Sequence, residues 1–101
     1  MGQRIELHEI LADILGSRNV YYQPPSNVKM KFPAIEYHLS RYNTKRADNK
    51  LYTLDTSYDV TLIELVPDSD KVKSILELPL CSFDRSFISD NLYHTVFTIY
   101  Y

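Results

Sequence analysis

The sequence predicts an α+β domain in which two helices pack on one face of a four-stranded, mainly antiparallel sheet. Two segments space their apolar residues as amphipathic helices do, and four segments are rich in β-branched and aromatic residues. The predicted elements follow the order α-β-β-α-β-β, and no strand-helix-strand unit demands parallel pairing. With 101 residues, 45% of them hydrophobic, residues 1–101 fit a single domain with one core.

The first predicted helix covers residues 4–17. Leu7, Leu11 and Ile14 recur at the spacing of one helical face, whereas the acidic residues lie elsewhere around the helix. Gly16 follows the last apolar residue and can adopt the left-handed conformation that closes a helix. We therefore expect the helix to end there.

We expect an extended connector over residues 17–32. Pro24 and Pro25 are incompatible with a helix interior and with a central strand. Tyr21 and Tyr22 stand directly before these prolines, which makes the segment stiff and aromatic rather than a flexible linker.

The first strand is predicted over residues 32–42. Ile35, Tyr37 and Leu39 alternate with polar residues, as in a strand with one buried face. Residues 43–50 contain two Asn, one Asp and no large apolar residue, so they predict a long hairpin loop.

The returning strand is predicted over residues 51–66. Tyr58, Val60 and Leu62 alternate with residues of the opposite face. Residues 51–54 can prolong this strand beyond the sheet. The sequence therefore predicts a long hairpin that projects from the domain.

The second helix is predicted to be short and to lie within residues 68–79. Asp68 or Ser69 can cap its first turn, and Val72 and Ile75 have helical spacing. A second hairpin should follow, with strands over residues 80–88 and 92–101 joined by a turn at 89–91. Alternation predicts that one face of its first strand carries Cys81, Phe83, Arg85 and Phe87.

The sequence contains no pattern that predicts catalysis, cofactor binding or metal binding. Cys81 is the only cysteine, so an intramolecular disulfide and a cysteine-based zinc site lack partners. His8, His38 and His94 fall on different elements and form no close ligand pair. With two glycines in the chain, a glycine-rich phosphate loop is excluded. We expect a non-enzymatic protein without cofactors.

Charge is distributed unevenly along the chain. Residues 29–50 hold six of the eleven Lys and Arg and two acids, a net charge of +4, whereas the rest has five against eleven, a net charge of −6. A basic lobe could meet the acidic body of another copy. It could equally be a solvated hairpin tip.

The nine tyrosines allow two interpretations. In the first, tyrosines stack nucleic-acid bases while neighbouring cations neutralise phosphates. The residues concerned would be Tyr37, Tyr42, Tyr52, Lys45, Arg46 and Lys50. In the second, the tyrosines are cross-strand and contact residues. We favour the second, because the net charge is −2 and no ribonucleoprotein motif is present.

Five stretches, in this order and spacing, resemble the small tail-terminator or tail-completion proteins of long-tailed bacteriophages and prophages. They are LHEILADILG, FPAIEYHL, SYDVTLIEL, DSDKVKSIL and FDRSFISDNLYHTVFTIYY, and together they span nearly the whole chain. The resemblance implies two helices against a four-stranded sheet. It also implies assembly into a ring, commonly a hexamer, that caps the tail tube and presents the head-joining surface.

The resemblance implies the tail tube protein and head-tail connector proteins as partners, besides other copies of the chain. DNA would at most pass through the ring lumen. The protein would act in the host cytoplasm during assembly and then in the virion tail or neck, and the first residues lack the apolar run of a signal peptide or membrane span. The candidate interface residues are Tyr21, Tyr22, Arg41, Lys45, Arg46, Lys50 and Tyr52.

Two alternatives remain open from the sequence. Other phage neck proteins of similar size, the head-tail connectors, share much of this pattern. A small nucleic-acid-binding module could use the same basic hairpin at residues 41–50.

Overall fold

The computed structural model describes residues 2–24, 29–47, 50–67 and 69–100, and the side chains of 4–24, 29–40, 56–67 and 69–100. Two helices and five strands make up this part of the chain, so the α+β class is confirmed. In chain order the elements are α1 (Gly2–Leu15), β1 (Val20–Tyr22), β2 (Ala34–Ala47), β3 (Lys50–Glu64), α2 (Asp70–Leu76), β4 (Cys81–Ser89) and β5 (Leu92–Tyr100).

The strands form one mixed sheet in the order β1-β2-β3-β5-β4. β1 runs parallel to β2, with Val20 opposite Ile35, and the other neighbours are antiparallel. The prediction of four strands and of the order α-β-β-α-β-β was therefore wrong. A strand of three residues is too short to show alternation, and Pro24 follows β1 rather than interrupting it.

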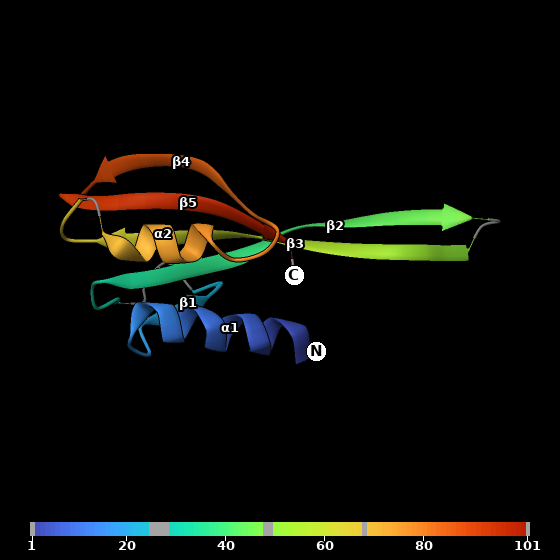
Figure 1. Ribbon diagram of the computed structural model, residues 1–101, viewed down its shortest axis with the longest axis horizontal. Coiled ribbons are helices and arrows are strands. Elements are labelled where there is room, and N and C mark those ends of the chain that lie inside the picture. The colour runs from blue at the N-terminus through green and yellow to red at the C-terminus, as the bar shows by residue number, and fades with distance from the viewer. Residues whose placement is uncertain (1, 25–28, 48–49, 68, 101) are drawn as a thin grey trace.

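The hairpin of β2 and β3 is longer than predicted. The two strands stay paired from Ala34 opposite Ile63 to Ala47 opposite Lys50, so the expected loop at 43–50 was wrong for 43–47 and 50. The polar composition of residues 43–50 predicted a loop, because apolar and polar residues alternate only in a strand with one buried face. Backbone pairing between strands does not need a buried face. The hairpin extends far beyond the sheet (Figure 1), and the molecule measures 51 × 28 × 23 Å.

Both helices pack on the same face of the sheet, as predicted. Leu7 and Leu11 of α1 are buried in one cluster with Ile75 of α2. In register, the strand residues of this cluster share one face. They are Val20, Ile35, Tyr37, Tyr58, Val60, Leu62, Phe97 and Ile99.

The predicted helix ends are confirmed. Gly16 has a φ of +80° and its N–H donates to the carbonyl of Ala12 at 2.9 Å, which closes α1. Ser69 Oγ accepts from the Lys71 N–H at 3.1 Å and caps α2. Asp68, the alternative cap, lies outside the described residues.

The prediction for the first strand of the second hairpin was partly wrong. A register shift in β4 lies between Phe83, opposite Phe97, and Arg85, opposite Val96. The extra residue reverses the alternation, because each β-bulge residue turns the following side chains to the other face. Phe83 therefore shares the helix-covered face with Phe97, and Arg85 shares the other face with Val96.

Candidate functional site

We define the arm as residues 41–47 of β2 and 50–56 of β3. These segments pair with each other, while β3 pairs with β5 from Ser57 onward. At about 3.3 Å per residue, seven residues extend about 20 Å. Figure 1 shows the arm leaving the body at one end of the long axis.

Five of the seven predicted interface residues lie on the arm. β2 carries Arg41, Lys45 and Arg46, and β3 carries Lys50 and Tyr52. The backbone register places Lys45 opposite Thr53 and Arg46 opposite Leu51. The side chains of these five residues lie outside the described part of the structure. The backbone alone shows that all five positions lie on the same two-stranded ribbon.

The other two predicted residues, Tyr21 and Tyr22, lie on β1, the edge strand that pairs with the body part of β2. Tyr22 is half-buried, its ring centroid is 4.9 Å from that of Tyr37, and the Arg4 guanidinium lies 4.2 Å above its ring. Tyr21 Oη accepts from the Lys31 N–H at 3.5 Å. The structure therefore does not bring these two tyrosines to the arm, and Tyr22 packs within the body.

Tyr37 joins α1 to the sheet through a buried polar contact. Its hydroxyl lies 2.8 Å from His8 Nδ1 and accepts from Arg4 at 3.3 Å. Burial raises the pKa of Tyr37. Burial, with the nearby Arg4 charge, lowers the pKa of His8. Both groups are therefore neutral at pH 7, and their contact holds the helix in place.

The other histidines form no metal centre. His38 lies 3.7 Å from Glu36 and 3.5 Å from Asp59 on the face of the sheet away from the helices. Among the described residues, no group of three or more His, Cys, Asp or Glu side chains could hold a metal ion. Burial raises the pKa of the Cys81 thiol, which disfavours the reactive thiolate. In the same part of the chain, no helix is long and apolar enough to cross a membrane.

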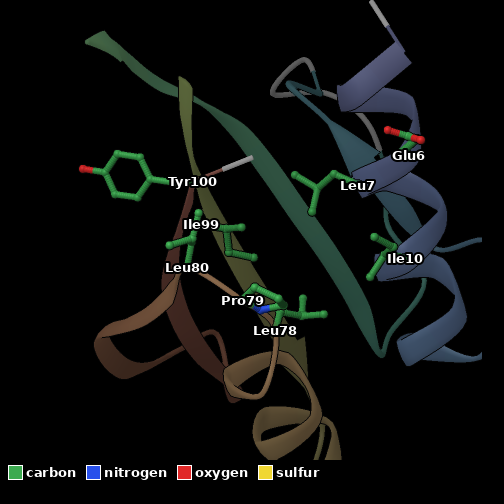
Figure 2. A pocket seen from close by; sticks show the side chains of 8 residues that line it. All are labelled: Glu6, Leu7, Ile10, Leu78, Pro79, Leu80, Ile99 and Tyr100. Atoms are coloured by element: carbon green, nitrogen blue, oxygen red, sulfur yellow. The ribbon is translucent and has the colours of Figure 1, made fainter. Parts of the chain in front are cut away.

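A small apolar hollow of about 350 Å³ lies between α1, the α2–β4 connection and the end of β5. Figure 2 shows Leu7 and Ile10 of α1 facing Leu78 and Pro79 across it. Among the described residues that line it, Glu6 is the one with a charged side chain. Such a lining can accept an apolar side chain, but it offers no pair of groups for proton transfer or nucleophilic attack.

A larger groove of about 810 Å³ lies between α2 and the outer part of the sheet. We call it the β4 groove. α2 supplies Val72 and Leu76 on one side, and β4 supplies Phe83 and Ile88 on the other. β4 is the outermost strand and all of its residues except Cys81 are exposed. The short helix does not reach across to cover this edge of the sheet.

Apolar side chains concentrate around the β4 groove. Ile88 is 66% exposed and Phe83 is 53% exposed. Phe87 borders the β4 groove, but its ring stacks on His94, with centroids 4.7 Å apart, on the face of the sheet that Arg85 shares. Exposed apolar residues gathered in one place on a small domain are typical of a contact surface.

Glu64 is the one acidic side chain among the described residues that is buried, with 6% of its surface exposed. It ends β3, pairs in register with Tyr93 and lines the β4 groove. No hydrogen bond or ion pair reaches its carboxylate from the described residues. An acidic residue that is mostly buried favours a cationic or hydrogen-bonding partner.

Sequence reasoning missed the β4 groove and Glu64. Alternation predicted a strand at β4 but could not show that the strand lies at an edge, because its position depends on the pairing of distant strands. The uneven charge distribution was the only signal, since it separated a basic hairpin from an acidic remainder.

Comparisons with known proteins assign no family. No family model matches the chain, and no curated protein is similar enough to match it. The candidate site therefore consists of the features that the molecule itself presents, namely the arm at one end and the β4 groove beside α2.

Proposed function

We propose that this protein is a structural subunit of a phage tail, a tail terminator that forms a ring on the tail tube and provides the head-joining surface. The proposal is supported by the resemblance of the five sequence stretches described above. Its partners would be further copies of the chain, the tube protein and the head-tail connector. It would act in the host cytoplasm during assembly and remain in the virion.

The observation that carries the proposal is the division of the molecule into a packed body and a long basic arm. The buried cluster formed by the described side chains lies in the helices and the five-stranded part of the sheet, and the backbone of the arm extends beyond it. A two-stranded ribbon is marginally stable by itself. An arm of this length is explained if it packs against another molecule.

Function in assembly also agrees with the character of the surfaces. The hollow of Figure 2 and the β4 groove are both lined mainly by apolar side chains. Contact surfaces between subunits have an apolar centre with charged residues at the rim. The acidic remainder of the chain suits a ring through which DNA passes, because negative walls do not hold phosphates.

Deleting the gene from the phage or prophage genome that carries it tests the proposal directly. Electron microscopy should show overlong tails and filled heads that are not joined. Tails of normal length beside unjoined heads would instead assign the protein to the head-tail connectors, the nearest alternative. Normal infectious particles would contradict both assignments.

Complementation of that deletion tests the arm. The double variant K45E/R46E should fail to restore joined particles. The matched control K29E/K31E reverses two charges at exposed body positions and should restore them. Equal rescue by both variants would show that the basic charge of the arm is not required.

A nucleic-acid-binding module is the second candidate, and the net charge of +4 over residues 29–50 is the observation that favours it. Titration of the protein with single- and double-stranded DNA at two salt concentrations tests this candidate. Phosphate contacts must weaken steeply with salt. Binding that K45E/R46E abolishes and K29E/K31E preserves would support this function over a purely structural one.

A further inference from the structure

We propose that the tip of the arm of one copy docks in the β4 groove of the next copy, where its cations pair with Glu64. The inference deepens the proposed function and rests on it for the requirement that copies of the chain meet. It adds the surface that receives the arm.

The arm tip and the β4 groove lie at the two ends of strand β3. Lys50 begins β3 at the tip of the arm, and Glu64 ends it in the β4 groove. Fifteen residues at about 3.3 Å each place these ends more than about 40 Å apart. The arm therefore cannot reach the β4 groove of its own chain. In Figure 1 the arm and the end of β3 lie at opposite ends of the molecule.

The charges of the two ends are complementary. Residues 41–50 carry four cations and one acid, a net charge of +3, whereas residues 64–90 carry six acids and three cations, a net charge of −3. Within the β4 groove, Glu64 and Asp70 outnumber Lys73, which is exposed. Opposite charges at opposite ends attract in the head-to-tail orientation and repel in the head-to-head one.

Glu64 gives this attraction a specific position. Only 6% of its surface is exposed, and it has no partner among the described residues. Among the described residues, Ser57 Oγ is the only side-chain nitrogen or oxygen that is both sealed from solvent and unpartnered. The carboxylate oxygens of Glu64 are not among the sealed, unpartnered atoms, and Glu64 lines the β4 groove, so an incoming Lys or Arg could reach it there.

The apolar lining of the β4 groove favours a protein segment over a free cation. Phe83, Ile88 and Leu76 would lose exposed surface beneath a docked hairpin tip. The outer edge of β4 is also open, since among the described strands β4 pairs with β5 alone. The arm can therefore enter from that side.

Such a contact uses two different surfaces of the same chain. Contacts of this kind close into rings when the rotation between copies allows it and otherwise continue as filaments. A variant in which either surface is blocked should not assemble with itself. A variant with a blocked arm should still bind a variant with a blocked groove, because each retains the surface that the other lacks. This property distinguishes the proposed contact from a symmetric dimer of β4 edges.

The test combines an arm-blocked variant, K45E/R46E, with a groove-blocked variant, Ile88→Arg. Sedimentation velocity over a dilution series should show that the unmodified chain associates beyond the dimer and that each variant alone is monomeric. An equimolar mixture should form a one-to-one dimer and nothing larger. Circular dichroism confirms that each variant folds.

Three results would overturn the inference. They are a monomeric unmodified chain at every concentration, a variant that associates like the unmodified chain, and a mixture that stays monomeric. The gene-deletion phenotype separates these from failure of the proposed function. If the two variants form mixed dimers but the gene deletion yields normal particles, the contact is supported and the tail function is not. If the deletion yields overlong tails but association does not depend on the arm, the tail function is supported and the contact is not.

A second variant tests Glu64 without altering the apolar lining. Glu64→Gln keeps the shape of the side chain and removes its charge, and it should weaken association by about tenfold or more, since a buried charge loses its partner. Glu77→Gln, at the exposed C-terminal end of α2, is the matched control and should leave association unchanged. Equal association of both variants with the unmodified chain would exclude Glu64 as the anchor.

Discussion

The two edges of the sheet are built in opposite ways. β1 has three residues, and its Tyr22 is held between Tyr37 and Arg4 of α1. β4 has nine residues, of which eight are exposed. An open strand with apolar side chains is a liability for a soluble protein. A short edge and a long, open edge in one small domain are consistent with the contact proposed above for β4.

The two edges also differ in what a mutation there should change. Around β1 the side chains carry the stability of the fold, because the buried phenol and the core aromatic contacts meet there. Around β4 the exposed side chains contribute little to folding and should matter for association. The predictions below test this separation, beginning with the largest effect.

Replacing Tyr37 by Ala should lower the free energy of unfolding by about 3–5 kcal/mol, because it leaves a cavity under α1 and removes a fully buried ring. Urea denaturation followed by circular dichroism measures the loss. On the open edge, Phe83→Ala should cost about 1 kcal/mol or less, since Phe83 is 53% exposed. Similar losses for both variants would erase the contrast between the edges.

Replacing Tyr37 by Phe should cost about 1 kcal/mol, because the ring remains and only the hydroxyl contact to His8 and Arg4 is lost. Tyr21→Phe is the matched control. Its hydroxyl makes one long contact of 3.5 Å at an exposed position, so its removal should change the unfolding free energy very little. The same denaturation assay compares the two, and a larger loss for Tyr21→Phe would contradict the role of the buried contact.

The pKa of His8, lowered by burial and by Arg4, should make stability depend on pH. Because the unfolded chain takes up a proton near pH 6.5 and the folded chain only at lower pH, stability is complete above pH 6.5 and falls as pH drops toward the folded pKa. The effect should be smaller than that of Tyr37→Phe, since water screens a half-exposed imidazole. Unfolding free energies between pH 5 and pH 8, measured for the unmodified chain and for His8→Gln, check this. An unchanged slope in the variant would assign the dependence to other groups.

The sequence predicted those parts of the fold that depend on residues close together in the chain, and it predicted less well the parts that depend on distant residues. Gly16 and Ser69 were identified correctly because helix ends depend on neighbouring residues. The strands around Tyr37 and Val60 were identified because one face of each is buried. The predicted extension of the returning strand over residues 51–54 is confirmed. β1 and residues 43–47 and 50 were missed, because a strand of three residues and a polar hairpin end do not show the alternation that predicts a strand.

The candidate site was predicted only in part. The charge count indicated a basic projection at Lys45 and Arg46, which the backbone places on the arm. The β4 groove could not be predicted as the acceptor, because nothing in the sequence distinguishes Glu64 from an ordinary polar residue at the end of a strand. Its burial beside Ile88 depends on the position of β4 in the sheet and on the length of α2.

The smallest expected change in stability is at Ile88, which is 66% exposed. Ile88→Thr keeps a β-branched side chain on β4 and should alter the unfolding free energy by no more than about 0.5 kcal/mol. If the β4 groove receives the arm, the same variant should still weaken self-association, because it removes apolar contact area at the docking surface. Leu65→Thr is the matched control, since Leu65 is 60% exposed and does not line the β4 groove. Sedimentation of both variants separates the two roles: loss of association by Ile88→Thr alone places function at the open edge, and loss by neither removes the β4 groove from the contact.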